Sequence, residues 1–332
     1  MKKNTIITIV IVVAIIIILA LVMRSPAKIA TTDLGTDTTN STDANSTTNP
    51  NTSNTVSTST SASNSQTNTS QTISDQYGTA TVIGHSVAGR PINAYTYLST
   101  QAGSTGSKEI LFVGGIHGGY EWNTVLVAYQ LMNYLKANSS TIPANLRVTV
   151  IPVLNPDGLY EVVGTTTGNF SASNVSSDST TVTAGRFNGN NVDLNRNFDC
   201  DWQTSGKWQS KTVSGGSAAF SEPESMAIKG YVETNKPVAV VVWYSAAGGV
   251  YASNCHDGVS ADTKALMNNF ARGSGYPASD NFDSYATTGD LTNWLAKIGT
   301  PAISVLLTNH TDTEWTRNLA GIKALLIYLM GQ

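Results

Sequence analysis

Charged side chains are scarce in this chain, and the basic ones form no cluster. Asp, Glu, Lys and Arg together make up 12% of the residues, and the formal net charge is -3. A surface that binds nucleic acid needs a concentration of lysine and arginine to neutralise the phosphates. We therefore expect no nucleic-acid partner.

Residues 5–23 lack any charge and are almost wholly apolar. A helix of this length, rising about 1.5 Å per residue, crosses the roughly 30 Å hydrocarbon core of a membrane. A cleaved signal peptide is the alternative, but the stretch exceeds the usual apolar region of about 7 to 15 residues and no clear cleavage site follows it. We predict a single-pass, uncleaved signal anchor, with residues 1–4 as a short cytoplasmic tail and the rest of the chain outside the cytoplasm.

The next segment, residues 24–76, has very few large apolar residues and is dominated by Ser, Thr and Asn. Such a composition cannot offset the entropy of ordering, so we predict a disordered linker with a reach on the order of 40 Å. Only two cysteines are present, Cys200 and Cys255, and both fall in the part predicted to lie outside the cytoplasm. A disulfide can persist outside the cytoplasm. The sequence is compatible both with a disulfide between the two cysteines and with two buried free thiols.

Residues 77–332 alternate strand-like apolar runs with segments of helical periodicity, which predicts a single α/β domain. One apolar run, Leu111–Val113, ends in two glycines and is followed by His117 and then Glu121. A neutral imidazole and a carboxylate held at the end of a strand are suitable ligands for zinc. The sequence thus offers the beginning of a metal site.

Five further motifs follow in a characteristic order. They are NPDG (155–158), VDLNRNFD (192–199), SEPE (221–224), YATTGD (285–290) and PAISVLLTNH (301–310). In this order, and over nearly all of Tyr77–Gln332, the chain resembles the M14 family of zinc carboxypeptidases. The resemblance implies a mixed, mostly parallel eight-stranded sheet sandwiched by helices, with a zinc ion at the carboxyl edge of the sheet, the edge at which ligands bind in open α/β sheets.

The resemblance assigns His117 and Glu121 as the first two zinc ligands. Their spacing is one residue longer than the family's H-x-x-E. Gly118 and Gly119 stand between them, and adjacent glycines permit unusual backbone angles. We therefore expect the glycines to absorb the extra residue.

The resemblance also assigns the residues that would handle a substrate. Asn195 and Arg196 match those that hold the C-terminal carboxylate of a peptide, for which a guanidinium offers a matching pair of donors. Arg186 matches the arginine that stabilises the oxyanion, and Tyr285 the tyrosine that closes over the substrate.

Two positions depart from the family pattern. The third zinc ligand, a histidine in the family, is Tyr244, and the general base, a glutamate in the family, is Leu306. A catalytic zinc keeps three protein ligands and one open position. A phenol with a pKa near 10 is a poor ligand at neutral pH, and loss of a positioned base typically costs about 10² to 10⁴ in rate. We expect the binding of zinc to be weakened or absent.

Three functions fit these observations. The favoured one is a membrane-tethered, catalytically impaired domain that recognises peptides by their free C-terminal carboxylate. The second is an active metallocarboxypeptidase, with Tyr244 on the metal, acting in proteolysis or in trimming peptidoglycan peptides. The third is a non-catalytic surface scaffold or adhesion module, because a fold alone does not give function. Whether the chain is an enzyme is left open by its sequence.

Overall fold

The computed structural model describes residues 71–332. The predicted cytoplasmic tail, the predicted membrane anchor at residues 5–23 and most of the predicted linker lie outside the described residues. Within residues 71–332, none of the helices combines the length and the apolar character needed to cross a membrane.

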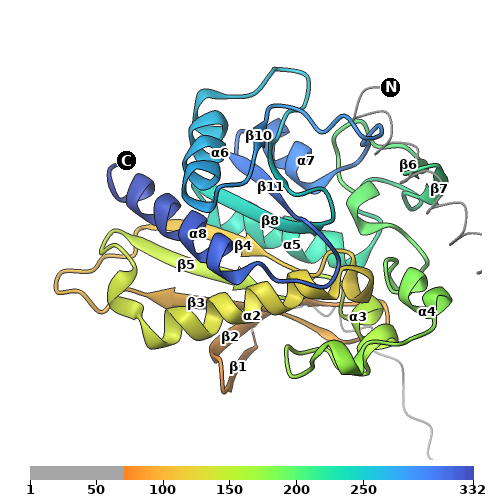
Figure 1. Cartoon of the computed structure of the whole chain (residues 1–332), viewed down its shortest axis with the longest axis horizontal. Coiled ribbons are helices and arrows are strands. Elements are labelled where there is room, and N and C mark those ends of the chain that lie inside the picture. The colour runs from red at the N-terminus through yellow and green to blue at the C-terminus, as the bar shows by residue number, and fades with distance from the viewer. Residues whose placement is uncertain (1–70) are drawn as a thin grey trace, which may run out of the picture. The chain divides into compact units, whose positions relative to one another are not determined.

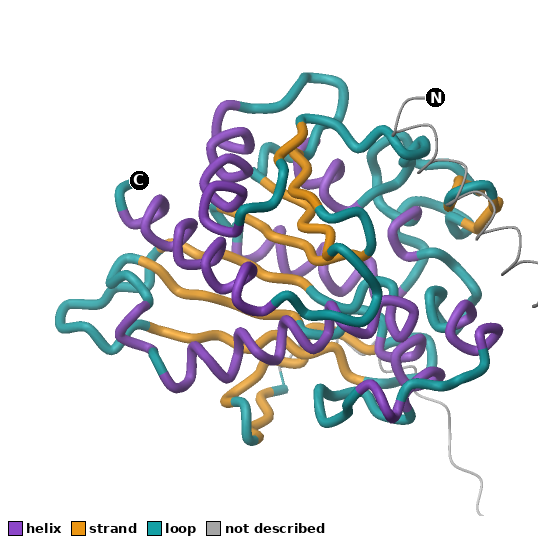
Figure 2. The backbone as a smooth tube through the Cα atoms, viewed as in Figure 1, coloured by secondary structure: helices purple, strands orange, loops and turns teal. Residues whose placement is uncertain are grey.

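A mixed sheet forms the centre of the described domain (Figures 1 and 2). Its strands, in spatial order, are β1 (Thr72–Asp75), β2 (Gly78–His85), β3 (Pro91–Leu98), β5 (Leu146–Ile151), β4 (Lys108–Val113), β8 (Ala239–Ser245), β11 (Ala302–Leu307), β9 (Gly249–Ala252) and β10 (Ala278–Ser279). The sheet thus has nine strands in the described part of the chain, where eight were predicted. A separate hairpin consists of β6 (Ser205–Trp208) and β7 (Lys211–Ser214).

The four central strands, β5, β4, β8 and β11, run parallel to one another. Antiparallel pairs flank them, with β1, β2 and β3 on one side and β9 beside β11 on the other. Parallel strands are normally covered on both faces and read as continuous apolar runs. The sequence of β8, AVVVWYS, is buried at every position, as this arrangement requires.

Helices cover both faces of the sheet. One face packs against α2 (Trp122–Ala137), α6 (Ala261–Ser274) and α8 (Trp315–Met330), and the other against α5 (Pro223–Asn235) and α7 (Leu291–Lys297). Because side chains alternate along a strand, Val241 and Trp243 of β8 face the first layer, whereas Tyr244 faces the second. The shorter elements are α3 (Pro156–Val163), α4 (Ser179–Ala184) and the 3-10 helices η1 (Gly118–Glu121), η2 (Ser139–Thr141), η3 (Ala172–Asn174) and η4 (Leu194–Arg196).

The folded domain begins earlier than the predicted boundary at Tyr77. Strand β1 pairs antiparallel with β2, with Thr72 opposite Thr81 and Asp75 opposite Gly78. The pairing is made by backbone groups at the edge of the sheet, so it does not need the apolar side chains whose absence suggested a linker. The same short edge strand raises the strand count from eight to nine.

The carboxyl ends of the central strands bring distant residues together. Strand β4 leads to His117, and Tyr244 and Leu306 lie near the ends of the neighbouring strands β8 and β11. This is the edge at which open α/β sheets bind ligands.

Candidate functional site

His117 and Glu121 meet because the chain after β4 turns tightly through η1. Gly118 has a φ of +46°, and a Cβ on Gly119 would lie 2.3 Å from Val162 of α3, so glycine is required at both positions. The turn brings Glu121 Oε1 to 3.0 Å from His117 Nδ1, and both side chains are buried. The extra residue between them is therefore accommodated within η1.

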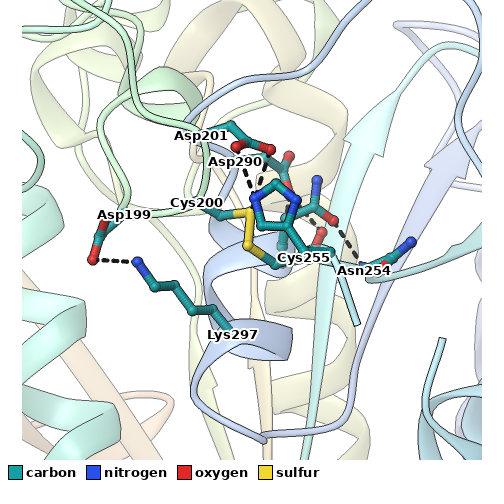
Figure 3. Close-up of a disulfide and its surroundings, with 10 residues drawn as sticks. Asp199, Cys200, Asp201, Asn254, Cys255, Asp290 and Lys297 are labelled. Carbon is teal, nitrogen blue, oxygen red and sulfur yellow. Dashed lines mark hydrogen bonds and ion pairs between the residues drawn. A yellow bond between two sulfur atoms is a disulfide. The ribbon is translucent and has the colours of Figure 1, made fainter. Parts of the chain in front are cut away.

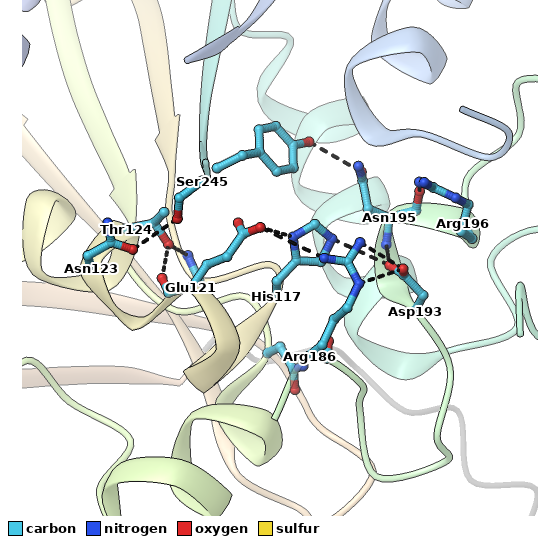
Figure 4. A network of polar contacts seen from close by, with 12 residues as sticks. His117, Glu121, Asn123, Thr124, Arg186, Asp193, Asn195, Arg196 and Ser245 are labelled. Carbon is cyan, nitrogen blue, oxygen red and sulfur yellow. Dashed lines mark hydrogen bonds and ion pairs between the residues drawn. The ribbon is translucent and has the colours of Figure 1, made fainter. Parts of the chain in front are cut away.

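A second carboxylate, Asp193, lies on the other side of the imidazole (Figure 4). Its Oδ1 is 3.4 Å from His117 Nε2. Burial opposes ionisation of Asp193, but the Arg186 guanidinium and His117 outweigh it and hold the pKa of that carboxyl well below its usual range. His117 is thus enclosed between two acidic side chains.

Arg186 turns inward toward these two acids. Its Nε and Nη2 lie 2.9 and 2.8 Å from Asp193 Oδ2, and its Nη1 lies 3.8 Å from Glu121 Oε1. Trp208 of β6 covers it, with the guanidinium carbon 4.5 Å from the ring centroid. Arg186, for which an oxyanion role was expected, is therefore engaged with Asp193 in this structure.

Tyr244 and Leu306 are neighbours on adjacent parallel strands, paired in register. The Tyr244 hydroxyl donates to Asn195 Oδ1 at 3.2 Å, and its ring centroid is 5.6 Å from that of His117. Burial, together with the charges of Asp290 and Glu121, raises the pKa of the Tyr244 phenol well above its usual value. At neutral pH this position therefore presents a protonated phenol, and Leu306 beside it offers no polar atom.

Asn195 is used within the protein. Its Oδ1 also accepts from the Leu291 backbone at 3.1 Å, and its Nδ2 donates to Asp290 at 2.8 Å. Asp290 in turn caps α7 by accepting from the backbone N–H of Asn293. We refer to Tyr244, Asn195 and Asp290 as the Tyr–Asn–Asp chain.

Arg196 is a buried cation that makes no ion pair with a carboxylate among residues 71–332. Its Nε and Nη2 donate to the backbone oxygen of Lys207 at 3.1 and 2.7 Å, and its Nη1 donates to the backbone oxygen of Asn195. The Tyr285 ring centroid is 5.8 Å from the guanidinium carbon. Since a guanidinium has five N–H groups, each terminal nitrogen keeps one N–H without an acceptor in the described part of the chain.

Arg196, Tyr285, Tyr244 and Leu306 all line one cavity of about 240 Å³. A second cavity of about 230 Å³ adjoins it, and its lining includes Arg186 and the aromatic side chains of Tyr120 and Trp208. The two share a border that includes Glu121 and Tyr285. The structure thus gathers the predicted ligand, substrate-binding and catalytic residues around these two adjoining cavities.

The donor atoms do not fit a catalytic zinc with three protein ligands. Both ring nitrogens of His117 and Oε2 of Glu121 lack a hydrogen-bond partner in the described residues, so two donors are available. At the third position the Tyr244 oxygen is protonated and bonded to Asn195. No carboxylate occupies the position of the base, which is Leu306.

A disulfide joins Cys200 and Cys255, with the Cα atoms 6.1 Å apart (Figure 3). Cys200 lies just after Arg196, and Cys255 directly follows Asn254, which lines the cavity. The backbone N–H of Gly289, next to Asp290, donates to the Cys200 oxygen at 2.7 Å. The bond therefore ties together segments that form the cavity wall.

Three residues of the site were not anticipated: Asp193, Asp290 and Trp208. Asp193 stands two residues before Asn195 in DLNR, and a carboxylate that orients a metal-binding imidazole is a common partner, so the motif contained a usable signal. Asp290 ends the YATTGD motif. For Trp208 the sequence contains no such signal, since its hairpin meets Arg186 only in three dimensions.

Comparisons with known proteins bear on the fold and on the family. No curated protein matches the sequence. The structure is similar to murein-tripeptide amidase MpaA from Escherichia coli O157, with a TM-score of 0.53 and 17% identity over 76% of this chain and 92% of the other. It is also similar to carboxypeptidase A from Helicoverpa armigera, with a TM-score of 0.56 and 19% identity over 76% of this chain and 67% of the other.

A third similar structure is bovine thrombin-activatable fibrinolysis inhibitor, with a TM-score of 0.55 and 16% identity over 76% of this chain and 88% of the other. At these identities the likeness shows the fold alone. The family model for zinc carboxypeptidases, Peptidase M14, matches residues 68–294, which is more than half of the chain. The chain therefore belongs to the M14 zinc carboxypeptidase family.

Proposed function

We propose that this domain binds peptides by their free C-terminal carboxylate and hydrolyses them poorly or not at all. The observation that carries the proposal is Arg196, a buried guanidinium that lines the cavity without a carboxylate partner in the described residues. A buried cation without a counter-ion is costly. A ligand carboxylate would accept from the two terminal N–H groups that have no acceptor, in the bidentate geometry that suits this pair.

The same cavity supports the absence of efficient turnover. Hydrolysis of a peptide bond needs a group that activates water, and Leu306 cannot accept a proton. Arg186, the remaining candidate for oxyanion stabilisation, donates to Asp193. The cleft would therefore be able to bind a peptide but would lack the groups needed to hydrolyse it efficiently.

We further propose that residues 5–23 anchor the chain in a membrane and that residues 24–76 form a tether for most of their length. The support is the uncharged apolar run and the polar composition that follows it. The disulfide between Cys200 and Cys255 supports a location outside the cytoplasm, because disulfides persist in oxidising compartments. Peptides displayed near that membrane surface would be the ligands within reach.

Binding is tested by titrating the purified protein with N-benzoyl-glycyl-phenylalanine and with its C-terminal amide. We expect the free acid to bind and the amide to bind at least about 30-fold more weakly, since breaking a buried charge pair costs about 2 kcal/mol or more. Arg196→Met should weaken binding of the acid by a similar factor. Arg272→Met, an identical change on an exposed face of α6, is the matched control and should leave binding unchanged. Equal binding of acid and amide would leave only a scaffold role.

An active metallopeptidase is the second candidate, and one observation favours it. Both ring nitrogens of His117 and Oε2 of Glu121 make no hydrogen bond within the described residues, which leaves them able to bind a metal ion. Metal analysis of the protein and an assay for free phenylalanine separate the two functions. One equivalent of zinc per chain, with turnover abolished by a chelator, would establish the peptidase.

A further inference from the structure

A second cluster of metal-ligating side chains surrounds the disulfide. The sulfur atoms of Cys200 and Cys255 and a ring nitrogen of His256 all lie within 4.8 Å of one another. Asp201 Oδ1 lies 2.9 Å from His256 Nε2 (Figure 3). Two potential thiolates and an imidazole therefore lie close together, and Asp201 contacts this group through His256 and through Cys200, whose Sγ lies 4.0 Å from Asp201 Oδ2. Each polar residue directly follows one of the cysteines in the chain.

The backbone takes the same left-handed conformation in both segments at this point. Asp201 has a φ of +53° and His256 a φ of +71°. Among residues other than glycine, aspartate and histidine are two of those that adopt the left-handed region most often. This conformation directs both side chains to one exposed point, where the ion pair between them stabilises little because the side chains are 51% and 70% exposed.

We propose that reduction of the Cys200–Cys255 disulfide creates a zinc site formed by Cys200, Cys255, His256 and Asp201. A dithiol reductant would exchange with the disulfide, becoming a disulfide itself while the protein gains two thiols. On binding Zn²⁺ the two thiols release two protons to solvent, and each thiolate forms a bond to the metal. The chemistry needs no other reactant.

The geometry of the four side chains suits this ion. In a tetrahedral site with Zn–S near 2.3 Å and Zn–N near 2.0 Å, the donor atoms stand about 3.5 to 3.8 Å apart. The two sulfur atoms and the His256 nitrogen, within 4.8 Å of one another, would reach that arrangement by side-chain rotation once the disulfide is reduced, and rotation of Asp201 would add its carboxylate. The exposed faces of His256 and Asp201 give the metal a route in from solvent.

This site is separate from the inherited one at His117 and does not depend on the proposed peptide binding. Zinc would replace the disulfide as the link between the segments that carry Arg196 and Asn254, two residues that line the cavity. These segments would therefore stay joined in both the oxidised and the reduced protein.

The test uses the purified full chain in two forms, oxidised, and reduced with an immobilised dithiol that is then removed without air. Each form is supplied with Zn²⁺, passed through gel filtration and analysed for metal. We expect the reduced form to carry one more equivalent of zinc than the oxidised form, and its thiols to react at least about 10-fold more slowly with iodoacetamide when zinc is present. Because the inherited site is the same in both forms, the difference reports on the new site alone.

His256→Ala keeps both cysteines and should lower the zinc affinity of the reduced form by at least about 10-fold, the lower end of the loss that follows removal of even a supporting partner. His85→Ala, which removes an exposed histidine from β2, is the matched control and should have no effect. Equal zinc content in the oxidised and reduced forms would overturn the proposal. So would unchanged affinity in His256→Ala, or a reduced chain whose circular dichroism shows loss of fold that zinc does not restore.

Discussion

Replacing Tyr244 by His and Leu306 by Glu should convert this domain into a zinc peptidase in two separable steps. Both positions line the same cavity and lie opposite each other in the β8–β11 pair. A histidine at position 244 would direct an imidazole to the side of the cavity that His117 faces, 5.6 Å away by ring centroid in the present structure. That supplies a third neutral donor where a protonated phenol now stands.

The two substitutions should differ in what they restore. Tyr244→His alone should bring the zinc content to one equivalent per chain, because it completes the three protein ligands of a catalytic site. Turnover should remain low until Leu306→Glu is added, and the addition should raise kcat by about 10² to 10⁴, the usual contribution of a positioned base. Losing the Tyr244–Asn195 hydrogen bond should cost about 1 kcal/mol of stability, which leaves a folded protein.

The assay combines metal analysis after dialysis against a weak chelator with release of phenylalanine from N-benzoyl-glycyl-phenylalanine. Tyr244→His with Leu306→Gln is the matched control, since glutamine fills the same volume but does not act as a base. Tyr244→Phe, which removes only the hydroxyl, should gain no zinc. Stoichiometric zinc in the unaltered protein would refute the reasoning, as would a folded double variant that fails to bind the metal.

Three further predictions concern stability. Replacing Cys200 and Cys255 by alanine opens a loop that spans 55 residues and should lower the free energy of unfolding, measured by urea titration, by about 4 kcal/mol. A loss below about 1 kcal/mol would show that the disulfide does not significantly constrain the unfolded chain. Gly119→Ala should destabilise by about 1 to 3 kcal/mol, because its Cβ would overlap α3, while Gly230→Ala, with open space around it, should not. Burial opposes ionisation of Glu314, but its hydrogen bonds prevail and lower its pKa. The ionised side chain therefore stabilises the folded state at pH 7, and this stabilisation is lost as the pH falls below the ordinary pKa of 4.5. Thermal melts of Glu314→Gln and of the parent should accordingly converge at acid pH.

The sequence was sufficient to predict the α/β class because the central strands are continuous apolar runs that alternate along the chain with segments such as α2 and α8, which carry apolar residues at helical spacing. It was insufficient at the edge of the sheet. Strand β1 has the sequence TISD, and its burial pattern shows no buried residue. Such a strand is held by backbone hydrogen bonds to β2, and composition does not report on those.

The site was predictable as a set of residues but not as a set of contacts. His117, Glu121, Asn195, Arg196 and Tyr285 all reach one cavity, as their motifs indicated. The direction of each side chain depends on neighbours that are remote in sequence. The pairing of the two cysteines was likewise undecidable from the sequence, because it depends on a Cα separation of 6.1 Å between residues 55 positions apart.

Contacts also explain why the two departures from the family pattern belong together. A phenol at position 244 is compatible with a buried cavity wall only if its hydroxyl has an acceptor, and the Tyr–Asn–Asp chain supplies one at 3.2 Å. A glutamate at position 306 would add a negative charge to a cavity that Glu121 and Asp290 already line, and both of these charges already raise the pKa of Tyr244. A third carboxylate without a compensating cation would be costly to bury there. Leucine removes that cost. With a tyrosine at the position of the third ligand, a leucine at position 306 therefore gives a more stable fold than a glutamate would. Arg196, by contrast, retains the two N–H donors that would bind a carboxylate.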